Sequence, residues 1–183
     1  MSIDMHGPGL WYVTRATGLV SLLLLTASVL LGLLTAGRFA SGRWPRFLTQ
    51  GLHRNIPLLV LVFLAMHIGS TVLDTYVSIS LTAVFVPFAS SYKTVWLSLG
   101  AVALDLLLAL IVTSLLRDRL GYRAWRRLHW LAYACWPVAV AHGLGIGTDR
   151  SAGWVVALTV GCIGCVGAAA AWRIFTIGSF GAP

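Results

Sequence analysis

The sequence predicts an all-α integral membrane protein, built as a bundle of five transmembrane helices. Of its 183 residues, 58% are hydrophobic and only 10% are charged, and the mean hydropathy is +0.88. These values are typical of a small membrane bundle and unlike those of a soluble domain. Five apolar segments also reach the roughly 20 residues that a helix needs to cross a bilayer.

The predicted spans follow one another with short connections. They cover roughly residues 11–36, 52–73, 94–116, 124–146 and 152–175. The apolar run from Leu19 to Leu34 is too long for the core of a signal peptide, so the first segment is expected to remain as a span. The remaining stretches are too short for a second unit, and we expect residues 1–183 to form a single domain.

The arginines predict the orientation of the bundle. Nine of them lie in or next to the first and third connections: Arg38, Arg43, Arg46, Arg54, Arg117, Arg119, Arg123, Arg126 and Arg127. The positive-inside rule then places these connections in the cytoplasm, the N-terminus outside and the C-terminus inside. We therefore expect a multi-pass protein of the inner (cytoplasmic) membrane. Because topology accounts for most of the net charge of +8, binding to nucleic acid is not expected.

Four of the five histidines form two pairs of similar spacing, His53 with His67 and His129 with His142. Along a helix, spacings of 14 and 13 residues correspond to about 21 and 19.5 Å, so each pair puts one ring near each face of the membrane. The second and fourth spans run in the same direction. His53 and His129 thus share the cytoplasmic level, and His67 and His142 share the outer level. Since imidazole is a common haem ligand and polar rings are costly in lipid, this pattern predicts two stacked haems.

The angular positions of the histidines fit this arrangement less well in the fourth span. At 100° per residue, 14 residues return to within about 40° of the starting face, whereas 13 residues leave His142 about 140° from His129. Pro137 lies between these two histidines. A kink at Pro137, or a rotation of one haem relative to the other, is expected to bring the ligands into register.

Two segments that carry these histidines resemble bacterial members of the ferric reductase-like transmembrane domain superfamily. They are GLHRNIPLLVLVFLAMH, residues 51–67, and RLGYRAWRRLHWLAYACWPVAVAHG, residues 119–143. This superfamily includes the NADPH oxidases, yeast-type ferric reductases and the membrane haem subunit of the bacterial methionine sulfoxide reductase system. The resemblance extends over the five spans. It implies two b-type haems, the inner one bound by His53 and His129 and the outer one by His67 and His142, with electrons passing from inner to outer haem.

The resemblance also indicates which redox components we expect a partner protein or the membrane to supply. NADPH oxidases continue past the last helix into flavin- and nicotinamide-binding domains, whereas this sequence ends shortly after Phe175. We expect no flavin or nicotinamide site in this chain, and electrons from a cytoplasmic flavin reductase or from membrane quinol. The acceptor on the outer face could be a periplasmic redox protein, a ferric chelate or oxygen.

Three assignments of function stay open. The first is an oxidoreductase component that moves electrons from a flavoprotein to the outer face and has no catalytic residue of its own. The second is a quinol-linked cytochrome b subunit that feeds a periplasmic reductase. The third is a haem-binding or proton-conducting module without net electron transport.

Several charged or polar residues are candidates for supporting roles. Related proteins carry an arginine near the outer haem, which suggests a propionate contact for Arg15; its alternative is a lipid phosphate. Arg126 and Arg127 precede His129 and could hold inner propionates, although topology alone explains arginines there. Asp105 could orient a ligand histidine, or be protonated and bonded to a neighbouring group. His6 is expected to be a surface residue.

Overall fold

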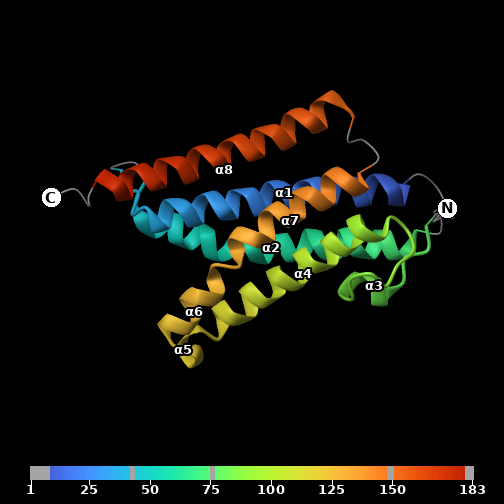
Figure 1. Cartoon of the computed structure of the whole chain (residues 1–183), viewed down its shortest axis with the longest axis horizontal. Coiled ribbons are helices and arrows are strands. Elements are labelled where there is room, and N and C mark those ends of the chain that lie inside the picture. Colours follow the sequence, from blue (N-terminus) through green and yellow to red (C-terminus); the bar gives the residue numbers. More distant parts are fainter. Residues whose placement is uncertain (1–8, 42–43, 75–76, 148–150, 180–183) are drawn as a thin grey trace, which may run out of the picture.

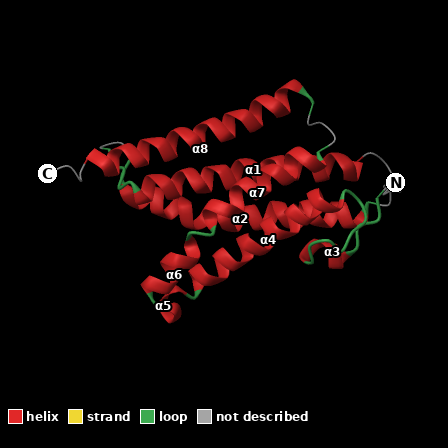
Figure 2. Cartoon of the chain, viewed as in Figure 1, coloured by secondary structure: helices red, strands yellow, loops and turns green. Residues whose placement is uncertain are grey.

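The computed structural model describes residues 9–41, 44–74, 77–147 and 151–179, and within these ranges all regular elements are helices (Figure 2). His6 lies outside the described residues. The helices are α1 (Gly9–Ala36), α2 (Arg46–Leu73), α3 (Leu81–Phe85), α4 (Thr94–Leu115), α5 (Arg117–Leu120), α6 (Tyr122–His129), α7 (Ala132–Ile146) and α8 (Gly153–Ser179). The predicted all-α class is confirmed.

Four of these helices are long and apolar enough to cross a membrane, namely α1, α2, α4 and α8. They correspond to the first, second, third and fifth predicted spans and support a multi-pass membrane protein. The fourth predicted span differs, because residues 124–146 do not form one continuous helix. The chain ends α6 at His129 and begins α7 at Ala132, with a turn at Trp130 and Leu131 between them (Figure 2).

The helices pack as two antiparallel pairs, α1 with α2 and α4 with α7, and α8 lies along α1 (Figure 1). Apolar side chains line the space between the two pairs, with Val60, Leu107 and Cys135 almost fully buried. A polar contact also joins the pairs, since the indole Nε1 of Trp136 on α7 donates to Oγ1 of Thr26 on α1 at 2.9 Å. Because α2 packs on α1 and α7 packs on α4, the sides of α2 and α7 that face each other are available for a site.

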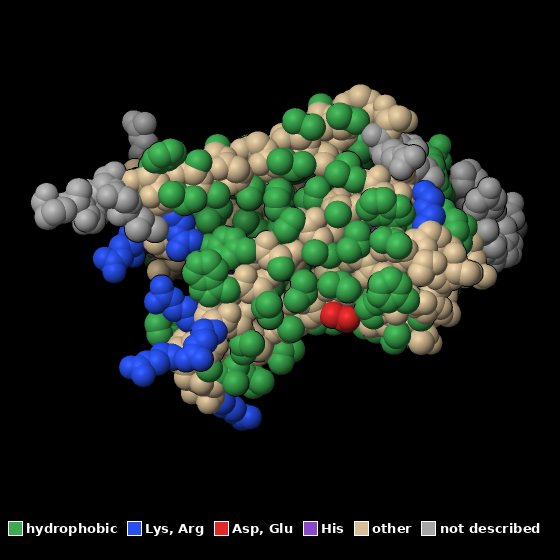
Figure 3. All heavy atoms as spheres, viewed as in Figure 1, with side chains coloured by type: hydrophobic (Ala, Val, Ile, Leu, Met, Phe, Trp, Pro, Cys, Tyr) green, Lys and Arg blue, Asp and Glu red, His purple; other side chains and the backbone are tan. Residues whose placement is uncertain are grey.

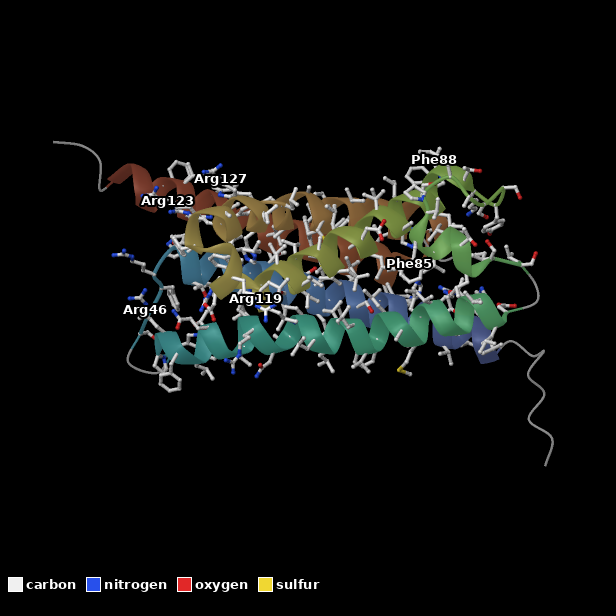
Figure 4. All side chains as sticks on the ribbon, turned by 90° about the horizontal axis from the view of Figure 1, so that it is seen from below. Arg46, Phe85, Phe88, Arg119, Arg123 and Arg127 are labelled. Carbon is white, nitrogen blue, oxygen red and sulfur yellow. The ribbon has the colours of Figure 1, made fainter. Side chains whose placement is uncertain are left out.

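Positive side chains gather at one end of the bundle, where α1 leads into α2 and α4 leads into α5 and α6 (Figure 3). Arg46, Arg119, Arg123 and Arg127 lie there, whereas Phe85 and Phe88 lie at the other end (Figure 4). We call these the arginine-rich end and the opposite end. Because α2 and α6–α7 both start at the arginine-rich end, they run in the same direction, as the sequence predicted.

The connection between α2 and α4 folds back over the opposite end of the bundle. Ile79 and Ala83 are buried, and α3 packs against α4. The backbone N–H of Phe88 donates to Oγ of Ser98 on α4 at 2.7 Å, which fastens this connection to the helix. Phe85 and Phe88 themselves remain exposed. The apolar sequence of the connection is therefore used to cover the bundle rather than to cross the membrane.

The turn between α6 and α7 explains how His129 and His142 approach a common face. The N–H groups of Trp130, Leu131, Tyr133 and Ala134 each donate to the carbonyl three residues earlier, which is the 3₁₀ pattern. A 3₁₀ residue turns about 120° instead of 100°, so four such residues add roughly 80°. The expected mismatch of about 140° falls to roughly 60°. Pro137 lies inside α7, and this change in winding comes earlier in the chain, around Trp130 and Leu131.

Asp105 does not take the orienting role that the sequence suggested for it. It lies on α4 with its side chain on the exposed surface of the bundle. The ring N–H groups of His53, His67 and His142 are instead bonded to backbone carbonyls, as described below. The exposed carboxyl group of Asp105 faces outward from α4, away from the space between the two helix pairs.

Candidate haem-binding site

The structure brings His53 of α2 and His129 of α6 together near the arginine-rich end. Their ring centroids are 6.0 Å apart, and the ring planes make an angle of 88°. A metal held by two imidazole nitrogens at about 2.0–2.1 Å each would put the two ring centroids roughly 6–6.5 Å apart. The spacing of this pair therefore suits a single metal ion between two axial imidazoles.

The other two histidines, His67 of α2 and His142 of α7, line one cavity toward the opposite end. Its volume is about 380 Å³, which lies in the range of pockets that bind small molecules and cofactors. The walls come from α1, α2, α4, α7 and α8, and Val77, Ile79 and Ala83 of the covering connection also line the cavity. The cavity extends to Leu107 near the middle of the bundle. Its lining is mostly apolar, as a macrocycle in a membrane requires.

Three of the four histidines are held in the same way by a neighbouring helix. Nδ1 lies 2.9 Å from the carbonyl oxygen of Ser28 for His53, 2.6 Å from that of Thr14 for His67, and 2.7 Å from that of Trp96 for His142. A carbonyl can only accept, so each Nδ1 must carry the proton and donate it. In the neutral ring Nε2 then keeps its lone pair. This is the tautomer that binds a metal through Nε2.

Glycines make room for these three rings. A Cβ atom placed on Gly32 would lie 3.1 Å from Cε1 of His53, one on Gly18 would lie 3.0 Å from Cε1 of His67, and one on Gly100 would lie 2.6 Å from Cε1 of His142. Each glycine stands four residues after the residue whose carbonyl accepts from the same ring. We call this combination of a glycine and its preceding carbonyl a glycine seat. A Cβ at Gly100 requires the His142 ring to shift, and one at Gly18 or Gly32 leaves a tight contact with the ring of His67 or His53.

The sequence analysis missed the glycine seats, although the sequence contains a signal for them. Gly18 and Gly32 are 14 residues apart on α1, the same spacing as His53 and His67 on the antiparallel helix α2. Equal spacings on two packed helices indicate residues that meet level by level. The third seat, at Gly100, has no second glycine on α4 to form such a pair.

His129 is held differently from the other three. Its Nδ1 is buried and has no hydrogen-bond partner in the described part of the chain. The ring stacks on Trp125, one turn earlier on α6, with centroids 5.1 Å apart and planes at 29°. Trp125 was not singled out by the sequence, because a tryptophan at the end of a membrane span is commonly an interfacial anchor.

The structure places the predicted arginines in two separate surroundings. Arg15 lines the same cavity as His67 and His142, and its guanidinium carbon lies 4.1 Å from the centre of the Trp11 ring. Arg126 and Arg127 are exposed on α6 and line a second cavity of about 320 Å³ with Tyr122, Arg123 and Trp130. An anion bound with His67 and His142 could thus be met by Arg15, and one near His129 by the α6 arginines.

The donor set fits haem better than a metal held by protein alone. Among the described residues, no three or more His, Cys, Asp or Glu side chains gather where they could hold a metal ion. The histidines instead form pairs, and a pair supplies the two axial ligands of an iron whose other ligands come from a porphyrin. The Nδ1 bonds and the glycine seats restrict the orientation of three of these rings.

Comparison with protein families matches residues 17–140 to a family described as ferric reductase like transmembrane component. The matched segment contains His53, His67 and His129, and ends just before His142. Comparison with curated proteins and with solved structures found no match. Proteins of this family are oxidoreductase-related, and membership indicates electron transfer across a membrane. Because the match spans more than half of the sequence, the chain belongs to the ferric reductase-like transmembrane component family.

Proposed function

We propose that this chain carries electrons across the cytoplasmic membrane as a di-haem b-type cytochrome, formed as one domain by residues 1–183. His53 and His129 would bind the inner haem, and His67 and His142 the outer haem. The observation that carries this proposal is the two-by-two pairing of four histidines, three of which have Nδ1 engaged and Nε2 free. The family membership supports the same class of activity.

The direction of transfer follows from the charges. The positive-inside rule assigns the arginine-rich end to the cytoplasm, with the N-terminus outside and the C-terminus inside. The donor would then be a cytoplasmic flavin reductase or membrane quinol. The acceptor would meet the opposite end, where the connection between α2 and α4 covers the cavity of His67 and His142.

The residues of the site have distinct tasks in this proposal. When bound, haem supplies an iron that takes up and releases one electron at a time. His53 with His129, and His67 with His142, would each hold one haem through two imidazoles, so a substrate would find no open iron to coordinate and an acceptor would react at the edge of the macrocycle. Arg15 would offer a bidentate partner for a propionate of the outer haem. Arg126 and Arg127 would do the same at the inner haem, and the apolar lining excludes water.

A haem assay with optical spectra tests this function. The purified protein should contain two haems per chain, with six-coordinate, low-spin spectra in both oxidation states, and a reduced-minus-oxidised difference spectrum typical of cytochrome b. A ratio near one haem, or a high-spin spectrum in fresh protein, would contradict the two-site proposal. Haem that is bound but not reduced by any flavoprotein or quinol donor would point to a haem-binding module without electron transport.

A further inference from the structure

In both helix pairs a glycine seats each histidine, with the exception of His129. In the first pair, Gly32 and Gly18 of α1 seat His53 and His67. In the second pair, Gly100 of α4 seats His142, which leaves the seat for His129 to be found. The residue 14 positions after Gly100, by analogy with Gly18 and Gly32, is Ser114. At the position that corresponds to the three seat glycines, α4 therefore carries the side chain of Ser114.

Ser114 is in contact with the residue that holds His129. Nε1 of Trp125 donates to Oγ of Ser114 at 3.3 Å, and the face of the same indole stacks on the His129 ring at 5.1 Å. The guanidinium carbon of Arg117 lies 5.7 Å from the centre of the Trp125 ring. The indole is thus fixed by a hydroxyl at its edge, with a cation and an imidazole as further neighbours.

We propose that Trp125, anchored by Ser114, is the positioning residue for His129 and replaces the glycine seat of the other three histidines. This inference rests on the proposed haem ligation. Stacking fixes the plane of a ring but supplies no acceptor for its Nδ1 proton. A histidine without such an acceptor is a less basic ligand and is held in one tautomer less strictly. His129 is therefore the ligand whose orientation depends most on a single neighbouring side chain.

The consequence is an asymmetry between the two haems. The outer haem has two ligands held by carbonyls, whereas the inner haem has one carbonyl-held ligand, His53, and one stacked ligand, His129. Loss of the indole should thus affect the inner haem alone. Loss of an outer-sphere partner of a ligand histidine typically weakens metal binding about 10–100-fold.

The test compares Trp125→Leu with Trp154→Leu in the full chain. Trp154 lies on α8, is 59% exposed and lines neither of the two cavities described above. The inner-haem signal is defined by what His129→Ala removes from the low-spin electron paramagnetic resonance spectrum. We expect Trp125→Leu to lose that signal, or to release the inner haem to an apoglobin about tenfold faster or more. Trp154→Leu should behave as the wild type.

Two conservative variants separate positioning from general damage. Trp125→Phe keeps an aromatic face and should restore most of the inner-haem signal. Ser114→Ala removes only the anchor of the indole and should accelerate inner-haem release in the same direction, but less than Trp125→Leu. The outer haem should be retained at the wild-type rate in all of them. If Trp125→Leu does not accumulate, the rates of inner-haem release from Ser114→Ala and Trp154→Leu are compared instead.

The outcomes distinguish this inference from the proposed function. A wild-type protein that lacks a second haem overturns the proposed function. The positioning role alone is overturned if the wild-type protein has two haems and both Trp125→Leu and Ser114→Ala retain the inner haem and its spectrum as Trp154→Leu does. Equal loss of both haems in the Trp125 and Ser114 variants would also overturn it, because a positioning residue for His129 acts on one site.

Discussion

The imidazole rings of His53 and His129 lie nearly perpendicular to each other, with centroids 6.0 Å apart and an angle of 88° between their planes. These residues come from two helix pairs that are not adjacent in sequence, so the contact requires the complete packing of the bundle. The first pair fixes His53 through the carbonyl of Ser28, and Trp125 stacks on His129 in the second. The contact between His53 and His129 therefore depends on the packing of the two parts of the bundle against each other.

The pairing of the histidines can be tested by single substitutions. His53→Ala and His129→Ala should each reduce the haem content from two to one per chain and remove the same spectral component. His67→Ala and His142→Ala should each remove the other component, because a haem with one axial ligand is five-coordinate and loosely held. Haem assays with electron paramagnetic resonance would check this. If His53→Ala and His129→Ala removed different components, α2 and α7 could not run in parallel.

The glycine seats predict an effect of adding a single methyl group. Gly18→Ala and Gly100→Ala should displace His67 and His142, and Gly32→Ala should displace His53. Overpacking of this kind typically costs about 1–3 kcal/mol of stability. Gly100→Ala should be the most damaging, since its Cβ would lie only 2.6 Å from the ring of His142. Each variant should lower occupancy of its own haem, as measured by haem content and thermal unfolding.

Gly69→Ala on α2 is the matched control for these three variants. It lies two residues from His67, but apart from its chain neighbours and the adjacent backbone of α2, no atom of the described residues is within 4 Å of the position its Cβ would take. Replacing an open helical glycine by alanine typically stabilises a helix by about 0.5–1 kcal/mol. Gly69→Ala should therefore keep both haems and a melting temperature at or above that of the wild type. Similar losses in Gly69→Ala and Gly18→Ala would argue against the seats.

The sequence predicted the parts of this structure that depend on periodicity and length. The 14-residue spacing of His53 and His67, with the arginines that set the helix directions, was enough to predict which histidines share a level. The turn at Trp130 and Leu131 could not be predicted, because no glycine or proline marks it and only the hydrogen bonds reveal it. Pro137, the obvious candidate for a break, remains inside α7.

The roles of individual side chains were harder to predict than the level of the membrane at which each histidine lies. The stacking of Trp125 on His129 depends on how α6 meets α4, which no local pattern encodes. Asp105 was placed near the ligands by its depth in the span, but depth does not tell which way a residue faces on a helix. Hydrophobicity around α4 is too uniform for the sequence to distinguish its exposed face from its buried face.

The outward position of Asp105 gives a prediction opposite to the orienting role. Asp105→Leu should keep two haems per chain with unchanged spectra, because the side chain is exposed and the ligand rings are bonded elsewhere. A carboxylate at the centre of a membrane helix disfavours insertion by about 2.5–3.5 kcal/mol, so the leucine variant should also accumulate in membranes at least as well as the wild type. Haem loss in Asp105→Leu, with Asp105→Asn unaffected, would contradict this.

Electron entry from the arginine-rich end is the last prediction. In proteoliposomes of known orientation, with a flavin reductase on that side, the wild-type protein should reduce both haems. His53→Ala should keep its outer haem, since His67 and His142 are untouched, but reduction of that haem from the arginine-rich side should fall to the background rate. His67→Ala is the matched control, because it should lose the outer haem and still be reduced at the inner haem. A membrane-permeant reductant should reduce the remaining haem in both variants, which shows that each is competent. If the outer haem of His53→Ala is reduced from the arginine-rich side as fast as in the wild type, electrons reach it without the inner haem, and the proposed relay from one end of the bundle to the other is wrong.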